Sequence, residues 1–86
     1  MNKILWHNRA RKQLLKIEFK KRMAIIENVE KLIDFPASFP SNVKKLKNHQ
    51  HDYRMRIGQY RVLFDYKETV KIISIEEVKK RNERTY

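Results

Sequence analysis

Three arginines in one short segment have the residue type and the spacing to bind a phosphate group. Residues 51–66, HDYRMRIGQYRVLFDY, read as two alternating strands joined by a two-residue turn that begins at Gly58. This register places Arg56 directly opposite Arg61, with Arg54 on the same face. Like charges opposite each other cost up to about 1 kcal/mol. The arginines could splay into water at little cost, or they could form a preformed anion site, because a guanidinium group matches phosphate oxygens.

Further basic residues adjoin this hairpin and favour the anion site. Residues 43–61 carry six basic groups and one acidic group, and residues 78–86 carry four and one. The whole chain has 21 Lys+Arg against 10 Asp+Glu, a net charge of +11. Such an excess predicts a polyanionic partner, with nucleic acid first, an acidic protein second and an anionic membrane third. The lysines expected to bind RNA phosphate are Lys44, Lys45 and Lys47.

Two histidines in the loop before the hairpin are candidates for proton transfer. His49 and His51 have a suitable unperturbed pKa, although loop histidines are more commonly solvated surface residues. A His-x-His metal site is disfavoured, since no cysteine or acidic partner is nearby. We therefore expect no metal and no cofactor.

The elements that must position these residues follow from periodicity. A helical pattern runs from about residue 9 to residue 33, but one helix of that length would measure about 38 Å, more than a domain of this size can cover. We therefore predict a break near residues 17–20. Two prolines within residues 34–42 end the helical segment. The expected strands are 3–6, 43–46, 53–57, 60–65 and 69–75.

This order predicts a single α+β domain over residues 1–86. An N-terminal strand and a helical hairpin should pack on one face of an antiparallel sheet of three to four strands, which leaves the other face open. We expect the polar C-terminal tail to lie across the sheet. The chain has no cysteine, no signal-peptide pattern and no membrane-span pattern, so we expect a cytoplasmic protein without a membrane partner.

The hairpin and its flanks resemble the RelE/ParE superfamily of bacterial toxins from toxin–antitoxin pairs. The matching stretches are VKKLKNHQHDYRMRIGQYRVLFDY, VKIISI and KKRNERTY. The resemblance implies a helical hairpin packed on an antiparallel sheet. It also implies one of two activities, since RelE-like members cut mRNA in the ribosomal A site without a metal, whereas ParE-like members poison DNA gyrase. Both kinds are neutralised by an antitoxin that wraps the toxin with an extended or helical segment.

The resemblance also implies roles for individual residues. The basic residues on the first hairpin strand fall on Arg54 and Arg56, and the arginine of the "YR" pair falls on Arg61. The C-terminal arginine falls on Arg81 and the late tyrosine on Tyr86. The spacing between these two is slightly short, so Arg84 could replace Arg81, and it is also a candidate phosphate ligand.

In metal-free RNA cleavage, converging arginines would stabilise the pentacoordinate phosphorane. Tyr86 could act as the base, because surrounding positive charge lowers the pKa of a phenol from about 10. We favour a RelE-like mRNA endoribonuclease that acts on mRNA in the ribosomal A site, contacts rRNA and is blocked by an acidic, wrapping antitoxin. The alternatives are a ParE-like gyrase inhibitor, which catalyses nothing, and a degenerate, non-toxic binding protein.

Overall fold

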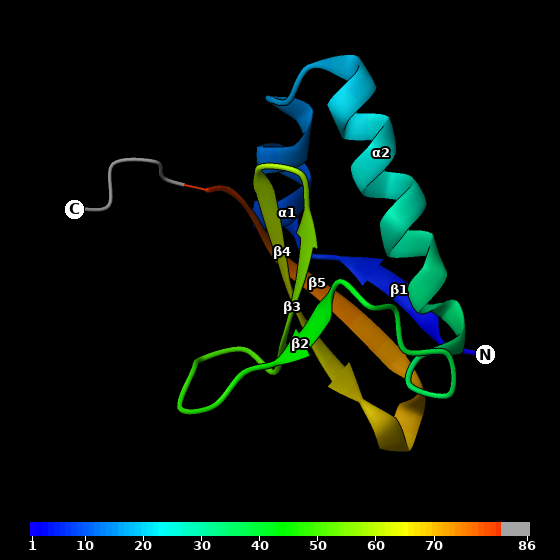
Figure 1. Cartoon of the computed structure of the whole chain (residues 1–86). Coiled ribbons are helices and arrows are strands. Elements are labelled where there is room, and N and C mark those ends of the chain that lie inside the picture. The colour runs from blue at the N-terminus through cyan, green and yellow to red at the C-terminus, as the bar shows by residue number, and fades with distance from the viewer. Residues whose placement is uncertain (82–86) are drawn as a thin grey trace.

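A five-stranded sheet carries two helices on one face in the computed structural model, which describes residues 1–81 (Figure 1). The strand order is β1-β5-β4-β3-β2, and β1 runs parallel to β5 while the other neighbours are antiparallel. The elements are β1 (Lys3–Trp6), α1 (Asn8–Leu15), α2 (Phe19–Glu30), the 3-10 helix η1 (Lys31–Asp34), β2 (Val43–Lys45), β3 (Tyr53–Ile57), β4 (Tyr60–Lys67), the 3-10 helix η2 (Glu68–Val70) and β5 (Ile72–Lys80). The predicted α+β fold is confirmed, but the sheet is larger than expected and mixed, because β1 joins its edge.

The helical segment is divided into two helices, as we predicted from its length. α1 ends at Leu15 and α2 begins at Phe19, so the break at residues 16–18 overlaps the predicted region of 17–20. Glu18 caps the second helix, since its carboxylate accepts a hydrogen bond from the backbone N–H of Lys21 at 3.2 Å. The break lets both helices lie over the sheet, as Figure 1 shows.

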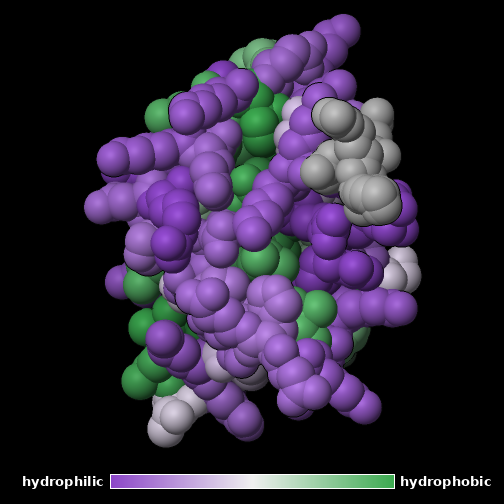
Figure 2. Space-filling model, turned by 90° about the vertical axis from the view of Figure 1, so that its left-hand side faces the viewer, coloured by the Kyte–Doolittle hydropathy of each residue, from purple (hydrophilic) through white to green (hydrophobic). Residues whose placement is uncertain are grey.

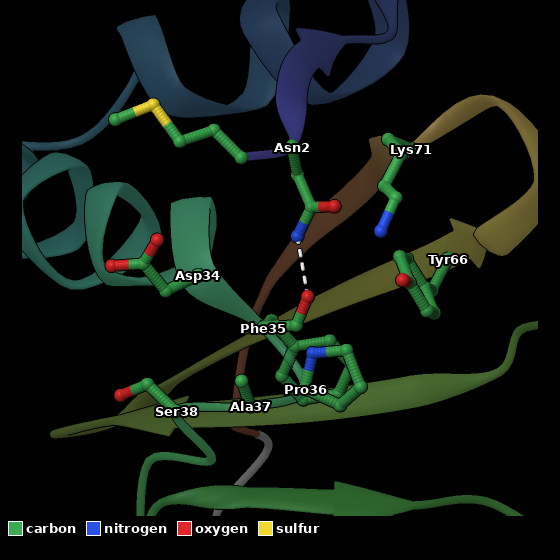
Figure 3. Close-up of a pocket in the computed structure, with 9 residues that line it drawn as sticks. Asn2, Asp34, Phe35, Pro36, Ala37, Ser38, Tyr66 and Lys71 are labelled. Atoms are coloured by element: carbon green, nitrogen blue, oxygen red, sulfur yellow. Dashed lines mark hydrogen bonds between the residues drawn. The ribbon is translucent and has the colours of Figure 1, made fainter.

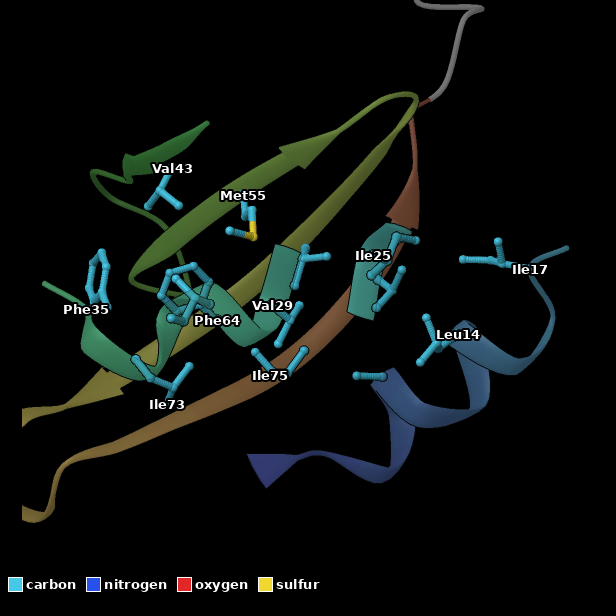
Figure 4. Close-up of a cluster of buried hydrophobic side chains, with 14 residues drawn as sticks. Leu14, Ile17, Ile25, Val29, Phe35, Val43, Met55, Phe64, Ile73 and Ile75 are labelled. Atoms are coloured by element: carbon cyan, nitrogen blue, oxygen red, sulfur yellow. The ribbon is translucent and has the colours of Figure 1, made fainter. Parts of the chain in front are cut away.

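The hydrophobic core fills the space between these helices and the sheet (Figure 4). Phe64 is fully buried, and the ring of Tyr53 stacks on it at 5.3 Å between centroids. Phe35 meets Phe64 edge-on at 5.6 Å. Burial of each large side chain stabilises the fold by about 1.5–3 kcal/mol. Because alternate residues of each strand point into this core, the others are left on the opposite face, here called the open face.

The β3–β4 hairpin has the predicted register. Arg56 pairs with Arg61 and Ile57 with Tyr60, on either side of a turn in which Gly58 has a φ of 58°. A positive φ at the first turn position is the requirement of a type II′ turn, and glycine meets it without steric cost.

The C-terminal segment departs from expectation. We predicted that residues 76–86 lie across the sheet, and residues 82–86 lie outside the described residues. The part that the structure describes continues β5 to Lys80 and pairs with β4 as far as Tyr60. For residues 76–80 the prediction was wrong: they have no apolar stripe, but their backbone completes the ladder along the full length of β4. A bulge interrupts that ladder between Leu63 and Phe64.

The N-terminus is tied to the end of the helical layer through Asn2. Its side-chain Nδ2 donates to the carbonyl oxygens of Phe35 at 2.6 Å and Leu32 at 3.0 Å, the former drawn in Figure 3. Within residues 1–81, no helix is both long and apolar enough to span a membrane.

Candidate nucleic-acid interface

Three cations lie abreast on the open face near the hairpin turn. Arg56 of β3 is opposite Arg61 of β4, and Arg61 is in turn opposite Lys79 of β5. Directly opposed residues of a sheet share a face. Arg61 is therefore flanked by a positive charge on each side. We call Arg56, Arg61 and Lys79 the basic row.

The next row of the open face begins with two more cations. Lys44 of β2 is opposite Arg54 of β3, followed by Leu63 of β4 and Glu77 of β5. The Nε of Arg54 is buried and has no hydrogen-bond partner among residues 1–81. Within the same residues, no carboxylate forms an ion pair with any of the three hairpin arginines. Their charge is thus available to an anion.

The remaining predicted phosphate ligands are divided between this face and other places. Lys45 is opposite Tyr53, so it lies on the helix-facing side of β2 and away from the basic row. Lys47 lies in the loop over residues 46–52. Arg81 follows β5, and its backbone N–H donates to the carbonyl of Gln59 in the hairpin turn. That contact places Arg81 beside the end of the basic row.

Two predicted site residues, Arg84 and Tyr86, lie outside the described residues. Their roles as phosphate ligand and base stay predictions.

The two histidines are in different environments. His49 is exposed and its Nδ1 accepts a hydrogen bond from the backbone N–H of His51 at 3.0 Å. His51 is only 5% exposed, and its ring lies between Asp65 of β4 and Glu77 of β5. Sequence reasoning missed these acidic neighbours, because they are far from His51 along the chain. Strand alternation places both carboxylates on the open face, but nothing in the sequence predicts that the loop folds over them.

The open face therefore has two ends of opposite character. Cations gather at the hairpin turn, whereas Asp65, Glu76 and Glu77 gather further along β4 and β5, under the loop. Figure 2 views the side of the molecule from which this loop projects, and most of the surface seen there is hydrophilic. The basic end of the open face can bind a phosphate, whereas the carboxylates at the other end repel anions.

A pocket elsewhere in the molecule does not involve the basic row. It lies beside Asn2 and is lined mainly by residues 34–38, with Tyr66 and Lys71 closing it (Figure 3). Among its lining residues, only Asp34 and Lys71 have a charged side chain. This pocket lacks the cluster of cations that makes the basic row a candidate RNA site.

The sequence model of the family described as "ParE toxin of type II toxin-antitoxin system, parDE" matches residues 4–85. The chain therefore belongs to this family, within the RelE/ParE superfamily, and is the toxin of a type II toxin–antitoxin system. No curated protein matches the chain in sequence.

Solved structures of related toxins share this fold. The archaeal RelE–RelB complex from Pyrococcus horikoshii OT3 superposes with a TM-score of 0.80 at 26% identity, over 95% of this chain and 97% of that chain. The isolated Escherichia coli RelE toxin gives a TM-score of 0.80 at 16% identity, over 96% and 87%. The RelBE2 toxin–antitoxin complex from Mycobacterium tuberculosis gives 0.75 at 20% identity, over 93% and 98%. The predicted superfamily is thus confirmed, and two of these relatives were solved with an antitoxin bound.

Proposed function

We propose that this toxin is a ribosome-dependent, metal-independent endoribonuclease that cuts mRNA, and that a cognate antitoxin neutralises it. The observation that carries the proposal is the position of Arg61 between Arg56 and Lys79 on the open face. Like charges in opposed positions repel, and the solvated pair between Lys79 and Glu77 offsets little of that repulsion. An anionic ligand bound between the cations would remove that repulsion, and its removal would add to the favourable free energy of binding.

The chemistry follows from the geometry of the basic row. During RNA cleavage the 2′-oxygen attacks the adjacent phosphorus, negative charge grows on the nonbridging oxygens, and the 5′-oxygen leaves with a proton. Arg61 would face those oxygens, and Arg56 would bind the same or the neighbouring phosphate. Preorganised donors of this kind stabilise a transition state without reorganisation at the moment of reaction.

The surrounding cations would hold the rest of the substrate. Arg54 and Lys44 lie in the adjacent row, where they can contact the RNA backbone, and Lys47 extends the surface along the loop. Arg81 lies at the hairpin turn, next to the basic row. We assign mRNA in the ribosomal A site and the neighbouring rRNA as partners, and the cytoplasm as the compartment, because these substrates are found there.

Proton transfer would fall to Tyr86 or to a loop histidine. Of the two histidines, His49 is exposed and can reach a bound nucleotide, whereas His51 is buried against carboxylates. Positive charge around the basic row would favour a phenolate at Tyr86.

A second function, inhibition of DNA gyrase, is favoured by one specific observation. The family model that matches residues 4–85 is that of the ParE toxins, and the resemblance implies that ParE-like members poison gyrase. On this alternative the basic row would contact a protein or its DNA and would catalyse nothing.

Induction of the toxin in a bacterial host separates the two functions. Growth arrest with loss of protein synthesis and codon-phased mRNA cuts is expected for the nuclease. Growth arrest with DNA breaks and intact mRNA contradicts it and supports gyrase inhibition. Unimpaired growth would instead indicate a non-toxic family member. Coexpression of the cognate antitoxin is the control, and it should restore growth.

A further inference from the structure

The end of the loop over residues 46–52, where the chain enters β3, brings the buried His51 against carboxylates of the open face. The Nδ1 of His51 is 3.4 Å from Asp65 Oδ2, and its Nε2 is 3.5 Å from Glu77 Oε2. His51 is 5% exposed, so this ring is held away from water.

The β4–β5 bulge adds a third side chain to the cluster. Leu63 pairs with Glu77 and Phe64 pairs with Ile75, which leaves Glu76 as the extra residue of β5. A bulge re-aims the side chain of the residue it inserts. One ligand atom from each of His51, Asp65 and Glu76 then lies within 4.8 Å of the others.

The histidine nitrogen in this cluster lacks a hydrogen-bond partner. The Nε2 of His51 is buried and makes no hydrogen bond within residues 1–81. Buried polar atoms nearly always have a partner, so an orphaned one indicates a missing ligand. A neutral imidazole has one N–H, so the other nitrogen presents its lone pair to a carboxylate oxygen, either Asp65 Oδ2 beside Nδ1 or Glu77 Oε2 beside Nε2. A cation bound between them would relieve that contact.

The carboxylates are held in place by hydrogen bonds of their own. Asp65 Oδ1 accepts from the backbone N–H of Asp52 at 2.8 Å, and Glu76 Oε2 accepts from the Ser74 hydroxyl at 2.6 Å. Carboxylates that ligate metals are oriented by outer partners in this way.

Two side-chain cations already approach the cluster from its solvent side. Arg9 Nη2 is 3.8 Å from Glu76 Oε1, and Lys79 Nζ is 3.6 Å from Glu77 Oε1. The side chains of Arg9 and Lys79 are 47% and 56% exposed, and such solvated pairs contribute little. They leave Asp65 Oδ2 and Glu77 Oε2 facing the imidazole ring of His51.

We propose that His51, Asp65 and Glu76 bind a divalent transition-metal ion, with Zn²⁺ as the best match. One imidazole nitrogen with carboxylate oxygens is a donor set that zinc accepts, whereas Mg²⁺ and Ca²⁺ prefer oxygen ligands alone. The ion is structural: it fastens the end of the 46–52 loop to the sheet. It takes no part in RNA cleavage, so it goes beyond the proposed function.

The test uses the full chain without an affinity tag, because a polyhistidine tag would itself bind the ion. After treatment with EDTA and desalting, the protein is titrated with ZnCl₂ in a calorimeter, and a parallel titration uses MgCl₂. We expect one Zn²⁺ per chain, no Mg²⁺ binding and a higher Tm with zinc. Ser74→Ala should weaken zinc binding by about 10–100-fold, the effect typical of an outer partner. His51→Ala should weaken it by more than that.

The exposed neighbour His49 supplies the matched control, and His49→Ala should bind zinc as tightly as the unmodified chain. Equal loss of binding in His49→Ala would overturn the proposal, because the ion would then be held by a surface histidine pair. Absence of zinc binding by the unmodified chain, or normal binding by His51→Ala, would also overturn it. If His51→Ala fails to fold, the absorption spectrum of the Co²⁺-loaded unmodified chain decides: nitrogen–oxygen ligation supports the site, and the spectrum of aqueous Co²⁺ overturns it. None of these results depends on toxicity, so they leave the nuclease proposal to its own test.

Discussion

Arg56 lies directly opposite Arg61 in the antiparallel ladder of β3 and β4. The pair is unfavourable by up to about 1 kcal/mol, which is small beside the burial of one large core side chain. The same two strands turn Met55 and Val62, both fully buried, to the other side. The hairpin therefore holds the fold with one face and gathers charge on the other, and stability and activity can be separated by substitution.

Replacement of Arg61 by alanine should abolish activity and spare the fold. The side chain stands at the centre of the basic row, so we expect Arg61→Ala to lower the rate of mRNA cleavage on ribosomes by about 10²–10³-fold. Stability should be unchanged or slightly higher, since two repulsive contacts are lost. Cleavage is followed by primer extension on a ribosome-bound message, and folding by circular dichroism.

The control for this experiment is Arg11→Ala, which removes an exposed arginine from α1 on the opposite layer. It should leave cleavage and antitoxin binding intact. An unfolded Arg61→Ala protein would show that Arg61 is structural, and the proposed phosphate-binding role would be wrong.

Charge reversal at Arg56 should raise stability and remove RNA binding. In Arg56→Glu the carboxylate faces Arg61, so repulsion is replaced by an opposite-charge pair worth about 0.2–1 kcal/mol. We expect a higher free energy of unfolding in urea than for Arg56→Ala, together with loss of RNA binding. A stability no greater than that of Arg56→Ala would mean that the two side chains do not interact.

Features that a local sequence pattern determines were predicted correctly, whereas contacts between segments far apart in the sequence were not. Alternation of apolar residues and the turn at Gly58 were enough to place all three hairpin arginines, because a shift of one residue would bury them. The parallel pairing of β1 with β5 could not be read from the chain, since it joins strands far apart in sequence. The carboxylates around His51 were missed for the same reason: they depend on a bulge and on a loop that folds back.

The turn residue itself can be tested by two substitutions. Gly58 has a φ of 58°, and a Cβ added there would meet no atom within 4 Å. The cost of Gly58→Ala is therefore one of backbone conformation alone, about 1–2 kcal/mol for an L-residue in the left-handed region. Gly58→Asn should cost less, because asparagine tolerates this region better. Urea denaturation of both variants measures the difference, and equal losses would indicate that the turn relaxes to another type.

The buried amide of Asn2 should contribute measurably to stability. It is 7% exposed and donates to the carbonyls of Leu32 and Phe35, so Asn2→Ala leaves both acceptors without that donor. We expect a loss of about 1–3 kcal/mol in the free energy of unfolding. Gln50→Ala, at an exposed loop position, should change it by less than about 0.5 kcal/mol. An unchanged stability in Asn2→Ala would mean that water replaces the amide.

Stability at alkaline pH should depend on Tyr53. Burial raises the pKa of its phenol above the ordinary value of 10.0, and the nearby carboxylate of Asp52 raises that pKa further. The folded state thus favours the neutral phenol. The resulting stability is fully present below the unfolded pKa near 10 and is lost as the pH rises through the folded pKa.

The variant Tyr53→Phe keeps the ring that stacks on Phe64 but cannot ionise. Urea denaturation should therefore show a smaller fall in stability between pH 9 and pH 11 for Tyr53→Phe than for the unmodified chain, with similar values at pH 7. Parallel curves for the two proteins would show that the phenol is as solvated in the folded state as in the unfolded chain.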